Sequence, residues 1–226
     1  MSSLAELGVS VVIPTLNAAE TLPTTLAALG NAEIVVADGG SSDATVSLAE
    51  AAGAKVVRAQ TGRGQQLVAG AEAASGAWLL FLHADTVPQS AWLEQVVAFV
   101  TYPVNARRAA AFRLAIDLPG AGARRLERWV AWRSRVLALP YGDQALLMAK
   151  PFYREVGGYR PLPLMEDVDL VRRIGSARLV MLESTMLTSG WRYRRSDVLR
   201  RGLRNFACLG LYFLGMPPRF ITRLYG

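Results

Sequence analysis

Lysine, histidine and cysteine are scarce in this chain of 226 residues, with two, one and one copies respectively. The single cysteine, Cys208, excludes an intramolecular disulfide, and Met1–Gly8 lacks the basic and then apolar pattern of a secretory signal. Both observations favour a reducing cytoplasm. Long apolar runs are also lacking: the longest, Phe206–Pro218, ends in two prolines and is shorter than the roughly 18 residues of a membrane-spanning helix. We therefore expect any membrane contact to be peripheral, at the inner face of the membrane.

Acidic residues are few in the second half of the chain. Residues 101–226 hold nine acidic and 22 basic residues, a net charge of +13, whereas residues 1–100 hold nine acidic and three basic residues, a net charge of −6. Arginine supplies 23 of the 25 basic residues, and its planar fork suits phosphate and carboxylate groups. An anionic partner is therefore expected for the second half. No linker separates the halves, so we expect one domain over residues 1–226.

Short β-branched runs alternate with Ala- and Leu-rich stretches in the first hundred residues, as in the βα units of a parallel sheet. The expected strands are Val9–Ile13, which Pro14 would stop, Glu33–Ala37, Lys55–Arg58 and Trp78–Leu82. The expected helices are Ala19–Leu29, Asp43–Ala52, Gln65–Ala74 and a stretch from a Ser90 cap to about Val100. This pattern predicts an α/β fold with a Rossmann-like, mostly parallel central sheet flanked by helices.

The second half is less regular. Strands are expected at Ala109–Ile116, Gln144–Met148 and Arg178–Leu182, and helices at Ala123–Leu139, Pro151–Val156 and Glu166–Ile174. A final helix, capped by Asp197, is expected to run to about Leu214.

Three polar clusters follow predicted strands: Pro14–Glu20, Asp38–Asp43 and His83–Asp85. The carboxyl ends of parallel strands meet at one edge of a sheet, where ligands bind. In the second cluster, Asp38 and the glycines that follow it could contact a ribose or a base. The alternative is that the cluster is an ordinary turn that caps the next helix. In the third, a carboxylate and an imidazole two residues apart suit a divalent metal that also takes diphosphate oxygens, and an ordinary turn is the alternative.

Charge is concentrated at three further places. Glu166, Asp167 and Asp169 lie on one predicted helix. They form either an exposed first turn, which the helix dipole favours, or the site of a general base. The second role is possible because crowded carboxylates raise one another's proton affinity. Ser189–Arg195 interleaves aromatic residues with three arginines, which suits a diphosphate, a single nucleic-acid strand or a solvated basic face. Arg63, between two glycines, is either a loop arginine or a contact to a base or phosphate.

The order of these clusters resembles the family 2 glycosyltransferases of GT-A fold. The segments that carry the resemblance are Val11–Asn17 (VVIPTLN), Ile34–Asp43 (IVVADGGSSD), Leu79–Asp85 (LLFLHAD) and Met165–Asp167 (MED). The resemblance spans roughly residues 8–195. Within the family, the sequence is most similar to small, single-domain bacterial members without transmembrane helices.

The resemblance implies a site for a UDP- or GDP-linked sugar donor. The positions it assigns to the nucleotide sugar are Pro14, Thr15, Asn17, Glu20, Asp38, Gly39, Arg63, His83, Ala84, Arg192, Arg194 and Arg195. Asp85, together with His83, would bind a Mn²⁺ or Mg²⁺ ion that bridges the donor diphosphate. Asp167 would be the base that deprotonates the acceptor hydroxyl, and Glu166 would support it or touch the acceptor. The implied reaction is an inverting transfer.

Two departures from the family pattern matter. His83 stands at the first position of the family's D-x-D motif, so the metal would depend on Asp85, with His83 as a ligand or a hydrogen-bond partner. Trp191–Arg194 replaces the Gln-x-x-Arg-Trp order of processive polymer synthases, which favours the transfer of a single sugar.

Two other functions fit parts of the sequence. A sugar nucleotidyltransferase would share the nucleotide-binding half, but Pro14–Asn17 stands where its Gly-rich basic loop is expected. A non-enzymatic binder of anionic polymers or lipid surfaces would explain the arginines but not the strand-end aspartates.

The acceptor, a small molecule or a lipid, is not identified by the sequence. Arg124–Arg135 and the apolar residues Leu199, Leu203, Phe206 and Phe213 suit a membrane face, core packing or a homodimer interface, and nucleic acid is not expected as a partner.

Overall fold

The β-branched runs of the first hundred residues form the parallel part of one sheet. The structure, a computed structural model, describes residues 3–190 and 198–225. Strand β1 (Val9–Thr15) pairs in parallel with β2 (Glu33–Asp38) and β4 (Trp78–Phe81), and β3 (Lys55–Arg58) pairs in parallel with β2. Val11 and Val12 point to opposite faces of β1, and both are fully buried, because both faces of this sheet are covered.

The second half of the chain extends the same sheet. The order of strands is β3-β2-β1-β4-β7-β6-β8-β5, with β5 (Thr86–Pro88), β6 (Ala109–Asp117), β7 (Leu146–Ala149) and β8 (Leu179–Ser189). β7 pairs antiparallel with β4 and with β6, β6 and β8 pair in parallel, and β5 pairs antiparallel with β8. The predicted mostly parallel α/β architecture is confirmed.

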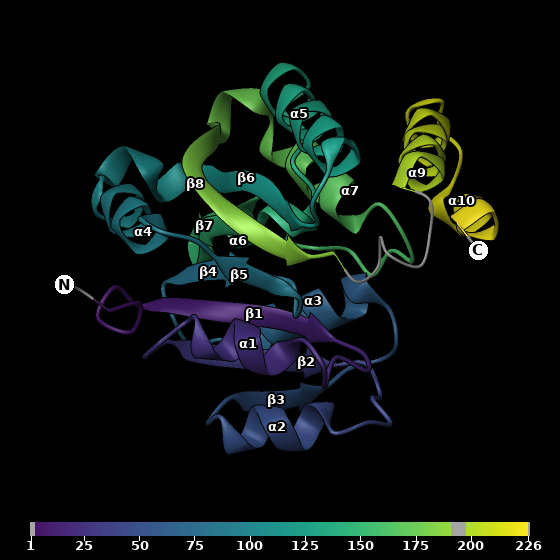
Figure 1. The fold of residues 1–226 in the computed structure, drawn as a ribbon. Coiled ribbons are helices and arrows are strands. Elements are labelled where there is room, and N and C mark those ends of the chain that lie inside the picture. The colour runs from purple at the N-terminus through teal and green to yellow at the C-terminus, as the bar shows by residue number, and fades with distance from the viewer. Residues whose placement is uncertain (1–2, 191–197, 226) are drawn as a thin grey trace.

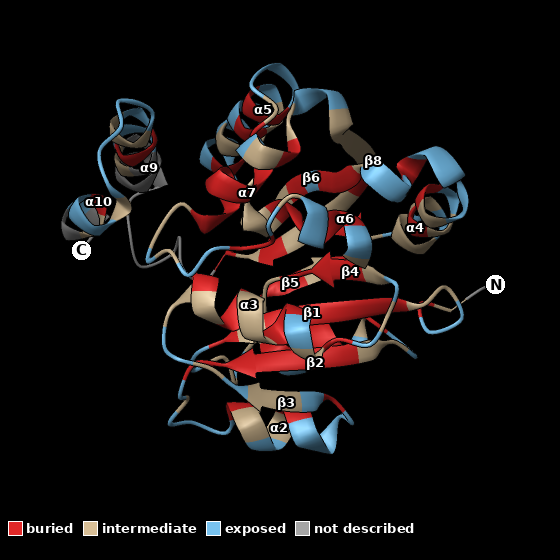
Figure 2. Ribbon diagram, turned by 180° about the vertical axis from the view of Figure 1, so that it is seen from behind, coloured by how far each residue is buried: buried red, intermediate tan, exposed pale blue. Residues whose placement is uncertain are grey.

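Helices cover both faces of the sheet (Figure 1). One face is covered by α1 (Leu22–Ala27), α2 (Thr45–Ala51) and α4 (Trp92–Thr101), and the other by α3 (Arg63–Ala73), α6 (Lys150–Glu155) and α7 (Glu166–Ile174). α5 (Ala121–Val136) packs on β6, and α9 (Val198–Phe213) and α10 (Pro218–Tyr225) end the chain. Short 3-10 turns lie at Pro103–Arg107, Gly142–Gln144 and Ser176–Arg178. Strands β1, β2 and β4 are almost wholly buried, whereas β3, at the edge of the sheet, has no buried residue (Figure 2).

Several predicted boundaries are wrong for identifiable reasons. Strand β1 runs through Pro14, because β4 pairs with β1 only as far as Val12 and the side of Pro14 that lacks an N–H has no neighbouring strand to bond. α4 begins after Ala91, which has a left-handed backbone (φ 62°), so Ser90 is not the cap. β5 was missed because it has three residues and ends in a proline, and β8 is longer than predicted.

The C-terminal segment contains two helices where one was predicted. Leu209 of α9 packs on Val168 and Val171 of α7, and the chain then turns at Gly215 (φ 87°) into α10. The predicted cap Asp197 lies outside the described residues. Among the described helices, none combines the length and apolar composition needed to cross a bilayer.

Candidate active site

A cavity of about 320 Å³ opens at the carboxyl ends of β1 and β4. Its lining includes eight of the predicted site residues: Pro14, Thr15, Asn17, Glu20, Arg63, His83, Ala84 and Asp85. Leu16, Ala18, Thr21, Thr61, Gly62, Gln66 and Ser189 complete it. This volume is in the range of small-molecule sites, and the position is where an open parallel sheet binds its ligands. The structure therefore brings the first and third polar clusters together, as expected from strand order.

The loops that follow β1 and β2 are tied to each other by hydrogen bonds. The backbone N–H of Asn17 donates to Ser41 Oγ (2.9 Å), and Asn17 Oδ1 accepts from the N–H of Ser42 (2.8 Å). Asp43 accepts from the N–H of Ala19 (3.1 Å) and the N–H of Thr45 (3.0 Å). These bonds hold Asn17 in a left-handed backbone (φ 52°), which asparagine tolerates better than most residues. One wall of the cavity is therefore fixed before any ligand arrives.

Asp38 is built into this wall rather than into the cavity lining. One carboxylate oxygen accepts from the N–H groups of Gly40 and Ser41 (both 2.9 Å), and the other from the hydroxyls of Ser41 (2.5 Å) and Thr15 (3.2 Å). Burial raises the pKa of Asp38, but these hydrogen bonds outweigh it and hold the pKa below its ordinary value. Its predicted contact with a base or ribose, and that of neighbouring Gly39, stay predictions.

Gln66 is a lining residue that the sequence did not reveal. Its side-chain amide donates to the carbonyl oxygens of Thr15 (2.5 Å) and Ala37 (3.0 Å), and it is 4% exposed. It thus bridges the ends of β1 and β2 behind the cavity. A glutamine inside a predicted helix gives no local signal for this role.

The pair Glu166–Asp167 begins α7, and hydrogen bonds fix Asp167 from two sides. Tyr159 donates its hydroxyl to Asp167 Oδ1 (3.2 Å), and the backbone N–H of Gly142 donates to Oδ2 (3.0 Å). Met165, directly before the pair, has a left-handed backbone (φ 67°), which is uncommon outside glycine and is often found at functional sites. Glu166 and Asp167 are 3% and 8% exposed, so the acidic turn is not the solvated helix start that was the alternative.

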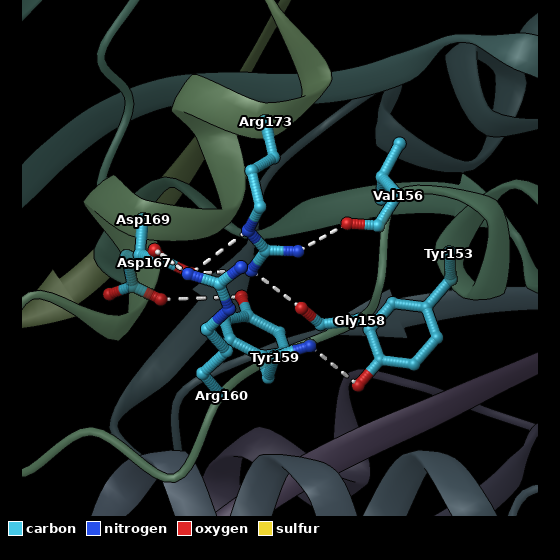
Figure 3. Close-up of polar contacts among 8 residues, drawn as sticks. All are labelled: Tyr153, Val156, Gly158, Tyr159, Arg160, Asp167, Asp169 and Arg173. Carbon is cyan, nitrogen blue, oxygen red and sulfur yellow. Dashed lines mark hydrogen bonds and ion pairs between the residues drawn. The ribbon is translucent and has the colours of Figure 1, made fainter.

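A second layer of polar contacts holds the segment that carries Tyr159 (Figure 3). The N–H of Tyr159 donates to the hydroxyl of Tyr153 (2.9 Å), and Arg173 donates to the carbonyls of Val156 and Gly158. Arg173 is itself ion-paired with Asp169 (2.5 Å), which also pairs with Arg160 (3.2 Å). Asp169, the third carboxylate of the predicted cluster, therefore stabilises the site rather than facing it.

Burial and neighbouring charge act on the ionisation of Glu166. Burial, reinforced by the negative charge of Asp167, raises the pKa of Glu166 to about 7, even though Arg63 opposes the shift. Arg63 Nη1 lies 3.4 Å from Glu166 and 3.7 Å from Asp167. Arg63 lines the cavity and also pairs with both carboxylates, so it connects the cavity to the pair.

Asp143 is a buried carboxylate that the sequence analysis did not single out. Burial raises its pKa, and the charges of Asp167 and Asp85 add to the shift while Arg133 and Arg63 oppose it. Its Oδ1 atom is buried and accepts no hydrogen bond from the described residues. Asp143 therefore belongs to the same electrostatic cluster as the predicted metal and base residues.

Gly142 contacts both the predicted metal residue His83 and the predicted base Asp167. A side chain there would place its Cβ 2.4 Å from His83 Nε2 and 2.8 Å from Asp167 Oδ2, so only glycine fits without a shift. His83 also lines the cavity, so its imidazole and the Asp167 carboxylate both lie against Gly142 beside the cavity.

The residues that would hold a metal are His83 and Asp85. Asp85 follows β4, is 8% exposed and is anchored at its carbonyl by the N–H of Ser189 (2.9 Å). No group of three or more His, Cys, Asp or Glu side chains within residues 3–190 and 198–225 is arranged to hold a metal ion. One carboxylate with one imidazole fits a divalent ion that completes its shell with phosphate oxygens and water, because Mg²⁺-type ions are commonly held this way.

The predicted diphosphate contacts Arg192, Arg194 and Arg195 lie outside the described residues, and their roles stay predictions.

Comparison with known proteins supports the resemblance that the sequence predicted. Residues 10–112, slightly less than half of the chain, match the model of glycosyl transferase family 2. The match covers the strands β1, β2 and β4 and the predicted residues that follow them. No curated protein matches the chain.

Solved structures confirm the GT-A fold. Glucosyl-3-phosphoglycerate synthase from Mycobacterium tuberculosis, in complex with Mn²⁺, UDP and its product, is similar at TM-score 0.63 and 21% identity, over 96% of this chain and 85% of that one. TarS from S. aureus is similar at TM-score 0.60 and 17% identity, over 80% of this chain. The match spans 36% of TarS and 60% of its fragment 1–349.

Proposed function

We propose that this protein transfers a single sugar from a UDP- or GDP-linked donor to an acceptor hydroxyl, with inversion at the anomeric carbon. The observation that carries the proposal is that the cavity at the strand ends lies next to the buried pair Glu166–Asp167. Arg63 lines the cavity and pairs with both carboxylates, and Gly142 donates its N–H to Asp167. The related structures support the donor class, since TarS is described in complex with UDP and the mycobacterial synthase with UDP-glucose and Mn²⁺.

The cavity would bind the nucleoside and diphosphate of the donor. The fixed loop that contains Asn17 would position the nucleoside, and Asp38 would hold that loop in place through its hydrogen bonds. Arg63 would meet the diphosphate, and we keep Arg192, Arg194 and Arg195 as further contacts to it. Cationic donors aimed at a leaving diphosphate stabilise the charge that develops on it.

Asp167 would act as the catalytic base. Its two hydrogen-bond donors, Tyr159 and Gly142, orient the carboxylate, and Arg63 lies 3.7 Å from it. Arg63 pairs with both carboxylates, so it would have to turn toward the donor diphosphate for Asp167 to take the acceptor proton. Glu166, whose pKa is raised to about 7, would carry a proton near neutral pH and keep the pair from holding two negative charges.

A divalent ion, Mn²⁺ or Mg²⁺, would be held by Asp85 with His83. When bound, such an ion supplies positive charge to the leaving diphosphate. The protein's own contribution is the placement of Asp85, which the end of β8 anchors at the floor of the cavity.

The decisive test is Asp167→Asn, with the exposed strand-end residue Asp117→Asn as a matched control. We expect Asp167→Asn to lose sugar transfer by about 10²–10⁴-fold, as for removal of a general base, while Asp117→Asn keeps it. The assay is transfer or donor hydrolysis across a panel of nucleotide sugars. UDP or GDP with Mn²⁺ should raise the melting temperature of Asp167→Asn as it does that of the wild type. Such a rise would show that folding and nucleotide binding are intact. Near-wild-type turnover would remove Asp167 as the base, and an α-linked product from an α-linked donor would contradict inversion.

The two competing functions make different predictions in the same assays. A sugar nucleotidyltransferase would release pyrophosphate from a nucleoside triphosphate and a sugar phosphate. A non-enzymatic binder would give no metal-dependent thermal shift with UDP or GDP. We further propose one domain over residues 1–226, located in the cytoplasm, and a non-processive reaction, which product analysis by chain length would check.

A further inference from the structure

Exposed aromatic residues gather where α5 and α9 meet. Trp129 and Trp132 stack on each other with ring centroids 5.0 Å apart, and Phe206 of α9 meets Trp129 edge-on at 5.9 Å. The three side chains are 41%, 47% and 57% exposed. Together with the neighbouring exposed apolar residues and arginines they form what we call the aromatic–arginine face, which comprises Trp129, Trp132, Val136, Phe206, Phe213 and Leu214 with Arg125, Arg128 and Arg135.

The face follows from helical spacing. Arg125, Trp129, Trp132 and Val136 recur at intervals of four, three and four residues, so they form one stripe along α5. Phe206 and Phe213, seven residues apart, lie on one side of α9. Leu209, one helical turn away on the same side of α9, packs on Val168 and Val171 of α7 and is 6% exposed. Phe206 and Phe213 flank this contact and stay 57% and 48% exposed.

Positive charge predominates in this region. Residues 198–225 contain five arginines and no acidic residue. Within residues 3–190 and 198–225, Arg135 is the one arginine of the face for which an ion pair is seen, with Glu183 of β8 (3.7 Å). In α5 the single acidic residue, Glu127, is ion-paired with Arg124 (2.8 Å) and also accepts the N–H of Ile116 (2.8 Å). Arg125 and Arg128 are exposed beside the tryptophans. Such a surface attracts a partner that is both apolar and anionic.

We propose that the aromatic–arginine face docks on the surface of an anionic lipid bilayer. Tryptophan rings prefer the headgroup level of a bilayer, where an apolar body and a polar N–H are both accommodated, and each arginine near an anionic surface adds to the attraction. A second copy of this chain fits the face less well, because two such faces would bring arginine against arginine. Single-stranded nucleic acid could use the aromatic rings but would leave Val136 and Leu214 unpaired with any apolar group.

The position of the face relates docking to the active site. α9 and α10 lie on the side of the molecule toward which β1 and β8 point, the same side as the carboxyl edge of the sheet (Figure 1). Leu209 of α9 packs on Val168, the residue after Asp167. Docking through this face would therefore hold the active site close to the bilayer, where an acceptor hydroxyl on a lipid or at its headgroup is concentrated.

The experiment is flotation of the full chain with vesicles of phosphatidylcholine containing about 30% phosphatidylglycerol, against vesicles of phosphatidylcholine alone. Two variants test the face, Trp129→Ala/Trp132→Ala and Arg125→Glu/Arg128→Glu. Arg58→Glu/Arg154→Glu is the matched control, since it makes the same charge change at exposed positions on β3 and α6. All variants are checked for folding by circular dichroism and by thermal shift with UDP or GDP and Mn²⁺, which does not depend on membrane binding.

We expect the wild type and the control to bind anionic vesicles at low salt, with weaker binding as salt rises, and each face variant to bind at least about tenfold more weakly. Absence of wild-type binding at low salt, or equal binding by the folded face variants, would overturn the proposal. So would a wild-type dimer that the same variants dissociate, or binding to single-stranded RNA that exceeds binding to vesicles. Loss of vesicle binding with an intact donor response separates this proposal from the proposed catalytic function.

Discussion

At the scale of single residues, Glu166 is costly to ionise. It is 3% exposed, adjoins Asp167 and faces Arg63 at 3.4 Å, and its pKa is raised to about 7, mainly by burial. A carboxyl that binds its proton more tightly in the folded protein than in the unfolded chain makes folding depend on pH.

The sign of that dependence is definite. The unfolded chain releases the proton near pH 4.5 and the folded protein near pH 7, so the free energy of unfolding falls as pH rises through this window, by up to about 3 kcal/mol. Glu166→Gln should remove the dependence, and the variant should exceed the wild type in stability above pH 7. Urea unfolding at pH 5, 6, 7 and 8 measures it. A wild type whose stability does not fall between pH 5 and pH 8 relative to Glu166→Gln would contradict the raised pKa.

Tyr159 offers a second residue-scale prediction, because its hydroxyl donates to the proposed base. A hydrogen bond to a charged group contributes about 1.5–3 kcal/mol. Tyr159→Phe should therefore lower kcat by roughly 10–100-fold and leave KM for the donor unchanged, since Tyr159 does not line the donor cavity. Tyr153→Phe, which removes the hydroxyl that accepts the N–H of Tyr159, should have a smaller effect. Steady-state kinetics of both variants measure kcat and KM. A kcat of Tyr159→Phe within twofold of the wild type would exclude a role of Tyr159 in positioning Asp167.

The lining of the cavity was predictable where residues follow strands in sequence. His83, Asp85 and Asn17 line it because a strand end places the next residues at that edge of the sheet. Tyr159, Gly142 and Gln66 were not predicted, because each acts on a partner 8 to 51 positions away and none has a local pattern. The predicted role of Asp38 stays a prediction, and its hydrogen bonds to Ser41, Gly40 and Thr15 were not predicted.

At the scale of elements, the start of α3 is packed tightly against the loop that follows Tyr159. A Cβ on Gly64 would lie 2.5 Å from the carbonyl oxygen of Arg160 and 2.8 Å from the backbone of Leu162. Backbone atoms cannot turn aside as a side chain can, so a larger residue has to move the loop itself.

Gly64→Ala should therefore lower the free energy of unfolding by about 1–3 kcal/mol, the usual cost of overpacking, and should also lower kcat by displacing the segment that holds Tyr159. Gly122→Ala is the matched control, since it adds the same methyl group to α5 with nothing within 4 Å. Thermal unfolding and kinetics of both variants measure the effect. Equal melting temperatures for the two variants would show that the loop yields freely.

Elements were predicted best where a single pattern governs them. β3 and α7 match their predicted bounds. The β-branched run in the four residues of β3 favours a strand, and the acidic first turn and apolar spacing of α7 favour a helix with a definite start. β5 and the length of β8 depend on pairing between segments about 100 residues apart, which no local pattern reports. The division of the C-terminal segment into α9 and α10 depends on Gly215, which the sequence analysis treated as part of an apolar run.

At the scale of the whole molecule, the two halves of opposite charge share one sheet. β4 of the acidic half pairs with β7 of the basic half, and β5, also of the acidic half, pairs with β8 at the far edge. The fold class was predictable because βα alternation dominates the first half. The interleaving of the halves was not, since it comes from strand pairing late in the chain.

This interleaving has a consequence for how the protein is made. Among the strands within residues 3–190, β5 pairs only with β8, and Ser189, the last residue of β8, anchors the carbonyl of Asp85. During synthesis from the N-terminus, β1 to β4 emerge about a hundred residues before β8 and can pair with one another early. The hydrogen bond that anchors the backbone of Asp85 cannot form until the ribosome has released Ser189. A nascent chain would therefore form β1 to β4 first and complete the proposed active site only after β8 has been made.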